Sequence, residues 1–378
     1  MKIKRILVFP MDNELGLEII NSLKYNKDIA LYSAGPIQIE VDFPLHKKHF
    51  IVSKKLDKQG FNKLNSIIEQ NKIEYIYPSD EIININLAKH STKVFSKIIS
   101  SPSTSLSIAT SKERTYEVLR DEIPIRNFSK NENSKKIYDI GCISDRVRGL
   151  LFCAGIEDFS SQTETVIESE SIYKDIFDNY AKKILKLIDL YGAWSFKLEE
   201  NLSGDFKLIS ITPWMNLKMK IYRYLGVNFP LLSVYECNRD NFQILRNEYD
   251  IKIIQTQKTK HQIILPYNTV YIDLDDTIII KNALNIQIFN FLNQCISNNK
   301  KIVLITKHQK NILKTLKKFN VAPSIFNRII HLEENDEKSQ YIVDRNSIFI
   351  DDSYHERKIV KEVNKIPVFA PSMMEGLI

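Results

Sequence analysis

The amino-acid sequence predicts an α/β protein with a doubly wound parallel sheet near each end of the chain and a mixed α+β region between them. In the first and last thirds, apolar strand-like runs alternate with amphipathic helical patterns, the order that builds parallel sheets. The middle third instead contains neighbouring strand-like runs joined by a short turn. The chain of 378 residues is also too long for one ordinary core. We therefore expect three domains, at residues 1–105, 106–265 and 266–378.

The first region opens on a buried-strand pattern at residues 5–9 and continues with a helical pattern at 14–23. A second strand is expected at 29–32. An amphipathic helix at 61–71 then leads into a third strand at 75–77. This regular alternation of strands and helices predicts a parallel sheet.

The middle region mixes helices with strands that are close in sequence. The strands at 193–198 and 206–211 are separated by a turn that contains Gly204, so antiparallel pairing is expected. The other elements expected here are helices at 111–120 and 173–191 and strands at 135–143 and 149–154.

The third region returns to regular alternation, which predicts a small doubly wound sheet. The strands expected here are residues 269–272, 301–305, 328–331 and 347–350, and the helices are 284–297, 309–319, 338–344 and 355–363.

The bulk composition excludes several classes of function. The formal net charge of +7 is modest for this length and the lysines are scattered, so no nucleic-acid partner is expected. The four cysteines lie far apart without a CxxC pair, which indicates reduced packing residues. No apolar stretch approaches the length of a membrane span, and the first residues do not form a signal peptide. We expect a cytoplasmic protein without a membrane partner.

Glycine spacing excludes two phosphate-binding motifs. The ten glycines include no pair spaced two residues apart, which a dinucleotide-binding fingerprint needs. None is followed by Lys and then Ser or Thr, as a P-loop requires. Any phosphate must therefore be held by side chains, a metal ion or ordinary turns.

Two aspartates follow the first strand of the third region. The apolar run at 269–272 ends in Asp273 and Asp275, with Thr277 two residues further on. Ligands of doubly wound sheets bind at the carboxyl ends of strands. Here Asp273 could attack phosphorus, while Asp275 could protonate the leaving oxygen and then activate water. Because crowded carboxylates repel one another, we expect Mg²⁺, which prefers oxygen ligands, as cofactor.

Two further strands of this region also end in polar residues. Thr306 follows the second strand, and its hydroxyl can hold a phosphate oxygen. Asp351 and Asp352 follow the fourth strand, with Glu356 one helical turn further on. Asp273, Asp275 and Asp352 could instead cap the helices that follow their strands, but capping does not need paired acids at two strand ends.

A lysine is expected to neutralise negative charge at this edge of the sheet. Lys338, which precedes the fourth strand, is our preferred residue. Lys307, directly after Thr306, competes with it for the role.

These residues resemble, in order, the four motifs of the haloacid dehalogenase (HAD) superfamily of aspartate-nucleophile phosphohydrolases. The resemblance covers most of residues 266–378. The matching residues are Asp273, Asp275 and Thr277 for the first motif, Thr306 for the second, Lys338 for the third, and Asp351, Asp352 and Glu356 for the fourth.

The resemblance implies that Asp273 forms an aspartyl-phosphate intermediate. It also implies that Asp273, the main-chain carbonyl of Asp275 and one acid of the fourth motif bind Mg²⁺, with Asp352 preferred to Asp351. The stretches between the motifs leave no room for the lid that HAD enzymes often insert. We therefore expect a domain without a cap insertion, covered by the first 265 residues.

The first 265 residues resemble the ATP-grasp superfamily, in the branch of the carbamoyl-phosphate synthase large subunit. The resemblance implies a pre-ATP-grasp Rossmann-like domain followed by a truncated α+β ATP-grasp-like domain. The stretches that carry it are the opening strand–helix unit and residues 77–81, 101–124, 192–196, 208–213 and 228–232.

Two departures from the ATP-grasp pattern predict a degenerate scaffold without ATP chemistry. The family binds Mg²⁺ through Glu-x-Asn at the end of a late strand, where this chain has Ser210 and Thr212. The segment between Pro124 and Tyr138 is too short for the family's lysine-bearing strands and glycine-rich loop. We expect Arg223, which could belong to a retained binding surface, to lie on a solvated helix face.

The sequence therefore predicts a Mg²⁺-dependent phosphomonoester hydrolase of HAD type that acts on a small-molecule phosphate ester. By analogy with bacterial polysaccharide and metabolite clusters, the ester is a sugar phosphate or an amino-alcohol phosphate. The ATP-grasp-like half would serve as lid, specificity platform or homodimer interface. The alternatives are an ATP-dependent carboxylate–amine ligase similar to carbamoyl-phosphate synthase, and a non-catalytic scaffold.

Overall fold

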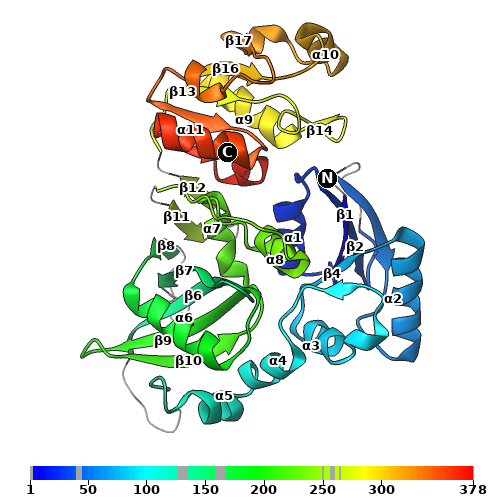
Figure 1. The fold of residues 1–378 in the computed structure, drawn as a ribbon, viewed down its shortest axis with the longest axis vertical. Coiled ribbons are helices and arrows are strands. Elements are labelled where there is room, and N and C mark those ends of the chain that lie inside the picture. The colour runs from blue at the N-terminus through cyan, green and yellow to red at the C-terminus, as the bar shows by residue number, and fades with distance from the viewer. Residues whose placement is uncertain are drawn as a thin grey trace.

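The chain folds around three main sheets, each with its own helices (Figure 1). The computed structural model describes residues 3–39, 45–126, 134–157, 167–248, 251–255, 260–263 and 265–377. Within these residues there are two five-stranded sheets, one seven-stranded sheet and a two-stranded hairpin. In Figure 1 the C-terminal sheet lies at the top, above the first sheet on the right and the seven-stranded sheet on the left. The prediction of a mixed α/β protein with parallel sheets is confirmed.

The first sheet is parallel throughout, with strand order β3-β2-β1-β4-β5. Its central strand is buried on both faces, and its alternate side chains belong to two different apolar clusters. The strands are β1 (Lys4–Phe9), β2 (Ile29–Gly35), β3 (His46–Ile51), β4 (Tyr75–Pro78) and β5 (Lys97–Ile98). The helices are α1 (Glu14–Leu23), α2 (Lys58–Asn71), α3 (Glu81–Lys89), α4 (Ser103–Ala109) and α5 (Lys112–Leu119), with one 3-10 turn, η1 (Ser91–Lys93).

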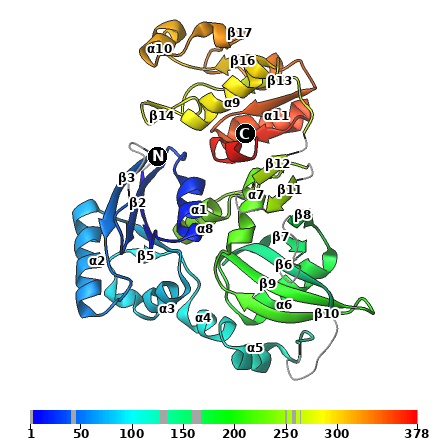
Figure 2. The same cartoon turned by 180° about the vertical axis from the view of Figure 1, so that it is seen from behind.

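Helix α8 (Phe229–Asn238) comes from the middle of the chain but packs on the first sheet. Its Val234 belongs to the same apolar cluster as Ile6 of β1, and both Figures 1 and 2 show α8 beside α1. Asn228 caps α8, and its side-chain amide donates a hydrogen bond of 2.8 Å to the carbonyl of Ser22. The middle region and the first sheet therefore share a core.

The seven-stranded sheet is antiparallel throughout, with strand order β10-β9-β6-β7-β8-β11-β12. Helix α6 (Asp175–Leu187) covers one face, where Phe177 and Ile184 join Trp194 of β9 in an apolar cluster. The strands are β6 (Ser134–Asp145), β7 (Gly149–Glu157), β8 (Ile167–Ile172), β9 (Gly192–Asn201), β10 (Phe206–Thr212), β11 (Ile251–Gln255) and β12 (Lys260–Ile263). Between β10 and α8 lie the 3-10 turn η2 (Leu217–Met219) and α7 (Lys220–Tyr224).

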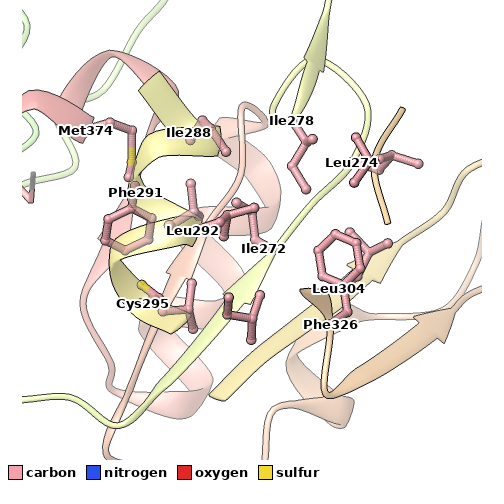
Figure 3. Close-up of a cluster of buried hydrophobic side chains, with 14 of the residues drawn as sticks. Ile272, Leu274, Ile278, Ile288, Phe291, Leu292, Cys295, Leu304, Phe326 and Met374 are labelled. Carbon is pink, nitrogen blue, oxygen red and sulfur yellow. The ribbon is translucent and has the colours of Figure 1, made fainter. Parts of the chain in front are cut away.

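The third sheet is parallel, with strand order β17-β16-β13-β18-β19. Figure 3 shows its core, where Phe291 and Leu292 of α9 lie against Ile272 of β13. The strands are β13 (Thr269–Ile272), β16 (Lys301–Thr306), β17 (Arg328–His331), β18 (Ser347–Ile350) and β19 (Val368–Phe369), and the hairpin is β14 (Ile279–Ile280) with β15 (Ala283–Leu284). The helices are α9 (Ile286–Ser297), α10 (Ile312–Lys318) and α11 (Tyr354–Asn364), with the 3-10 turns η3 (Pro323–Ile325), η4 (Lys338–Tyr341) and η5 (Pro371–Gly376).

A buried charged group joins the three parts of the chain. Arg223 of α7 is 1% exposed, and its guanidinium binds both carboxylate oxygens of Glu18 in α1, at 2.8 and 3.0 Å. A third nitrogen of the guanidinium donates to the carbonyl of Ser372 in η5. The expectation that Arg223 lies on a solvated helix face is therefore wrong, because its charge is paired inside the protein.

Several elements differ from those expected from the sequence. The helix expected at 338–344 is the short turn η4, and the helix expected at 173–191 is the shorter α6. Strand β3 was not expected, because its basic residues hide the apolar alternation. The division of the chain at residues 105 and 265 stays a prediction. None of the described helices is long and apolar enough to cross a membrane.

Candidate functional site

The carboxyl edge of the third sheet brings together acidic residues from two neighbouring strands. Ile272 of β13 and Ile350 of β18 are paired in the register, so Asp273 and Asp351 follow at the same level of the sheet. The backbone N–H of Asp273 donates to the carbonyl of Ile350 at 3.0 Å, and this bond fixes the end of β13. The exposed fractions of the two aspartates are only 5% and 1%.

Lys338 lies between these two buried aspartates. Its Nζ is 2.6 Å from Oδ1 of Asp273 and 2.6 Å from Oδ2 of Asp351. Burial raises the pKa of both carboxyls, while the charge of Lys338 acts in the opposite direction. Burial alone would lower the pKa of Lys338, but its two carboxylate partners raise it above the usual value. The lysine therefore stays protonated between two acids that share one positive charge.

Asp352 completes an acidic cluster with these residues. One carboxylate oxygen of each of Asp273, Asp351 and Asp352 lies within 4.8 Å of the other two. The backbone N–H of Asp352 donates to Oγ1 of Thr277 at 3.0 Å, which holds the turn after β18 in place. Oδ2 of Asp352 is also 2.8 Å from Nζ of Lys27. Three oxygens at this spacing suit a hard cation such as Mg²⁺.

Thr306 ends β16, the strand beside β13. The residue is 1% exposed, and its Oγ1 has no hydrogen-bond partner within the part of the chain that the structure describes. Buried hydroxyls are nearly always hydrogen-bonded, because an unpaired one costs free energy. This hydroxyl lies at the same edge of the sheet as Asp273, where it is available to a ligand.

Asp275 does not belong to the acidic cluster through its side chain. Its carboxylate is 53% exposed and lies 2.8 Å from Nδ1 of His308, whose other ring nitrogen is 2.8 Å from Oγ1 of Thr315. His308 had no predicted role, because it belongs to no recognisable spacing pattern. The proposed use of the Asp275 main-chain carbonyl as a metal ligand stays a prediction.

The two lysines that compete for the charge-neutralising role lie in different environments. Lys338 contacts the acidic cluster, whereas Nζ of Lys307 is 2.7 Å from a carboxylate oxygen of Glu356. Glu356 is therefore neutralised outside the cluster.

A second polar surface lies on the face of the seven-stranded sheet opposite to α6. Trp194 and its alternate neighbours on β9 pack towards α6, so the residues between them point to the other face. The register places Ser210 of β10, Lys197 of β9 and Asp139 of β6 in one row across this face. Thr212 forms the next row with Ser195. We call this surface the polar face.

Charged groups on the polar face are arranged around two buried carboxylates. Asp139 has 7% of its side chain exposed and lies 3.8 Å from Nζ of Lys197 and 3.7 Å from Nζ of Lys218. Glu199 has 3% exposed and lies 3.3 Å from a guanidinium nitrogen of Arg126. Alternation along β9 was visible in the sequence, but only the strand pairing reveals which residues share the face.

Comparison with known proteins finds similarity at the level of fold. No family model and no curated protein matches the chain. Among solved structures, biotin carboxylase from Campylobacter jejuni, in a β-γ-ATP complex, is 11% identical over 67% of this chain and 75% of its own, with a TM-score of 0.54. The biotin carboxylase domain of Hydrogenobacter thermophilus 2-oxoglutarate carboxylase is 10% identical over 67% and 74%, with a TM-score of 0.52.

Pyruvate carboxylase from Rhizobium etli is 9% identical over 67% of this chain, with a TM-score of 0.53. This chain spans only 30% of that enzyme's length. All three similarities cover about two thirds of the chain, and they support the predicted ATP-grasp-like region.

These comparisons overturn the functional prediction. The similar structures are ATP-dependent carboxylases and not phosphatases, so the prediction of an HAD-type phosphomonoester hydrolase is wrong. The classification as a hydrolase or phosphatase is wrong for the same reason, and the comparisons give no support to an HAD domain or to a phosphate ester as partner. They favour the alternative of an ATP-dependent ligase.

Proposed function

We propose that this protein is an ATP-dependent ligase of the ATP-grasp type, which activates a carboxylate. The observation that carries the proposal is the charged polar face, in a fold similar to that of biotin carboxylases. The Hydrogenobacter domain was solved as a dimer with MgADP and bicarbonate. Nucleotide phosphates and carboxylates are anions, and both need cationic partners in a binding site. That dimer also supports the prediction that two copies of this chain pair through the ATP-grasp-like region.

The residues present do not fit a Mg²⁺ ion held in the family's usual way. Ser210 and Thr212 stand where the family has a carboxylate and an amide, and hydroxyls are weaker ligands for this cation. Lys197, however, lies directly opposite Ser210 in the register. We propose that the ammonium groups of Lys197 and Lys218 neutralise the ligand's charge directly, while Asp139 holds them in position.

Calorimetric titration with ATP and ADP, with and without Mg²⁺, tests the proposal together with an assay for ADP release from carboxylic acid and amine mixtures. We expect nucleotide binding that Lys197→Met weakens by about tenfold, the effect of one charge-assisted hydrogen bond. Lys182→Met is a matched control, since this exposed lysine lies on α6, which covers the opposite face. Failure of both nucleotides to bind the wild type would refute the ligase function.

A second proposal concerns the acidic cluster. We propose that Asp273, Asp351 and Asp352 bind one Mg²⁺ ion at the edge of the third sheet. Three carboxylates face the buried ammonium of Lys338 and the half-exposed ammonium of Lys27 there, so the carboxylates outnumber the lysines that pair with them and a cation can neutralise the remaining charge. The unpaired hydroxyl of Thr306 at the neighbouring strand end supports a binding site at the same edge.

Titration of the metal-free protein with Mg²⁺ tests this second proposal. We expect one ion per chain, and we expect Asp352→Asn to abolish the binding because it removes a charged ligand. Asp336→Asn is the control, since this aspartate lies outside the cluster, in the segment between β17 and η4. Equal Mg²⁺ binding by wild type and Asp352→Asn would exclude the cluster as the binding site.

A further inference from the structure

A cavity of about 680 Å³ lies where the three parts of the chain meet. Its walls come from the loop after α1, from α8 and the segment that follows it, and from the start of α11 with η5. The volume is within the range of small-molecule binding sites in proteins. Because Asp352 also lines it, the cavity opens beside the acidic cluster.

Arg357 of α11 lines this cavity. One of its guanidinium nitrogens donates to the main-chain carbonyl of Asp351 at 2.6 Å. Within the described residues, no carboxylate lies at ion-pair distance from this guanidinium. A guanidinium carries five N–H donors in a planar fork, which matches the geometry of carboxylate and phosphate groups. Its remaining donors are therefore suited to an anion inside the cavity.

Lys27 adds a second cation at the same end of the cavity. The loop after α1 carries it across to the third sheet, where its Nζ is 2.8 Å from Asp352 and 3.5 Å from Asp276. Its side chain remains 48% exposed, so the ammonium can also reach a ligand. A lysine from the first part of the chain thus covers an edge formed by the last part.

The rest of the cavity wall is suited to the body of a small organic molecule. Tyr235 and Phe242 supply aromatic surface, and Gln243 is joined to the hydroxyl of Tyr354 at 3.3 Å. The wall also contains two carboxylates, Asp28 and Asp240, and Asp240 is 3.2 Å from Nζ of Lys4. Asp240 already has a cationic partner, whereas Arg357 has no carboxylate at ion-pair distance among the described residues, so Arg357 is the better match for the anionic group of a ligand.

We propose that this cavity binds a small molecule through a carboxylate or phosphate group held by Arg357 and Lys27. The cavity adjoins the Mg²⁺ site proposed above. The proposal rests on that site in one respect, since Asp352 belongs to both. The cavity differs from the polar face of the seven-stranded sheet, and it makes the first part of the chain a contributor to the ligand site of the last part.

Titration with inorganic phosphate and with malonate, each with and without Mg²⁺, tests the proposal and distinguishes the two anion classes. We expect at least one anion to bind, and we expect Arg357→Gln to weaken the binding by about tenfold. Lys27→Met should also weaken it, and at the same time strengthen Mg²⁺ binding, because Asp352 loses its cationic partner. This opposite effect on the two ligands would not follow from a general loss of structure.

Lys358→Met serves as the control, because it removes the same charge from α11 at a side chain outside the cavity. The proposal would be overturned if the wild type bound neither anion. It would also be overturned if Arg357→Gln and Lys358→Met bound the anion equally well. Asp352→Asn separates the two sites: it should abolish Mg²⁺ binding but retain or strengthen anion binding. Anion binding that depends on Arg357 in a protein that binds no Mg²⁺ would refute only the metal site.

Discussion

Replacement of Lys338 by Met is expected to lower the free energy of unfolding by about 3–5 kcal/mol in the absence of divalent cations, because it leaves buried carboxylates without their partner. Both partners of Lys338, Asp273 and Asp351, are almost completely buried. Urea denaturation in EDTA measures the loss. Added Mg²⁺ should restore part of it, since a cation that binds only the folded state stabilises that state.

The loss in Lys338→Met should depend on pH. Burial raises the pKa of Asp273 and Asp351 above the unfolded value of 3.8. The folded state then binds more protons than the unfolded chain between the two pKa values, so stability falls as pH rises through that window. Without Lys338 the folded pKa values rise further. The loss should therefore be larger at pH 8 than at about pH 5.

Lys307→Met is the matched control for this experiment. Its ion pair with Glu356 lies at the same edge of the sheet but is partly exposed, so its removal should cost at most about 1 kcal/mol. A loss in Lys338→Met no larger than that in Lys307→Met would contradict the buried ion-pair arrangement.

Replacement of Arg223 by Met is expected to cost about 3–5 kcal/mol of stability, because Glu18 remains buried without its cation. The variant should also loosen the contact between the three parts of the chain, since Arg223 holds α1 and η5 together. Urea denaturation measures the first effect. Limited proteolysis, with new cleavage in the connecting segments, detects the second.

A double-mutant cycle isolates the contribution of the pair. Glu18→Gln alone should destabilise, but the double variant should lose less than the sum of the single losses. Arg120→Met, at an arginine that is 55% exposed, should change stability very little. Additive losses at Arg223 and Glu18 would show that the pair does not act as a unit.

The sequence predicted much of the fold because apolar periodicity is strong in the parallel regions. Strand β13 and helix α1 have the bounds expected from that pattern. Short or polar elements such as β3 and the β14–β15 hairpin were not predicted, because few of their side chains follow a clear alternation. The helix expected at 338–344 is only the short turn η4, and its Lys338 is held inside the protein by two carboxylates, a contact that the local sequence pattern does not reveal.

The acidic residues of the candidate site could be predicted because parallel strands end at the same edge of a sheet. Contributions from distant parts of the chain could not be predicted in this way. Lys27 and Arg223 look like ordinary surface residues in the sequence, and only the packing of the three parts brings each to its acidic partner. Assigning a reaction from the order of the motifs was wrong, because the spacing of motifs does not by itself determine the reaction that a protein catalyses.

The triple contact of Arg223 has a consequence for how this protein can change over evolutionary time. Glu18, Arg223 and Ser372 come from widely separated stretches of the coding sequence, yet they meet at one buried point. Recombination that replaced any one of the three parts with a diverged counterpart would leave a buried charge or carbonyl without its complement. The three parts should therefore be inherited together, and their descendants should diverge as a set.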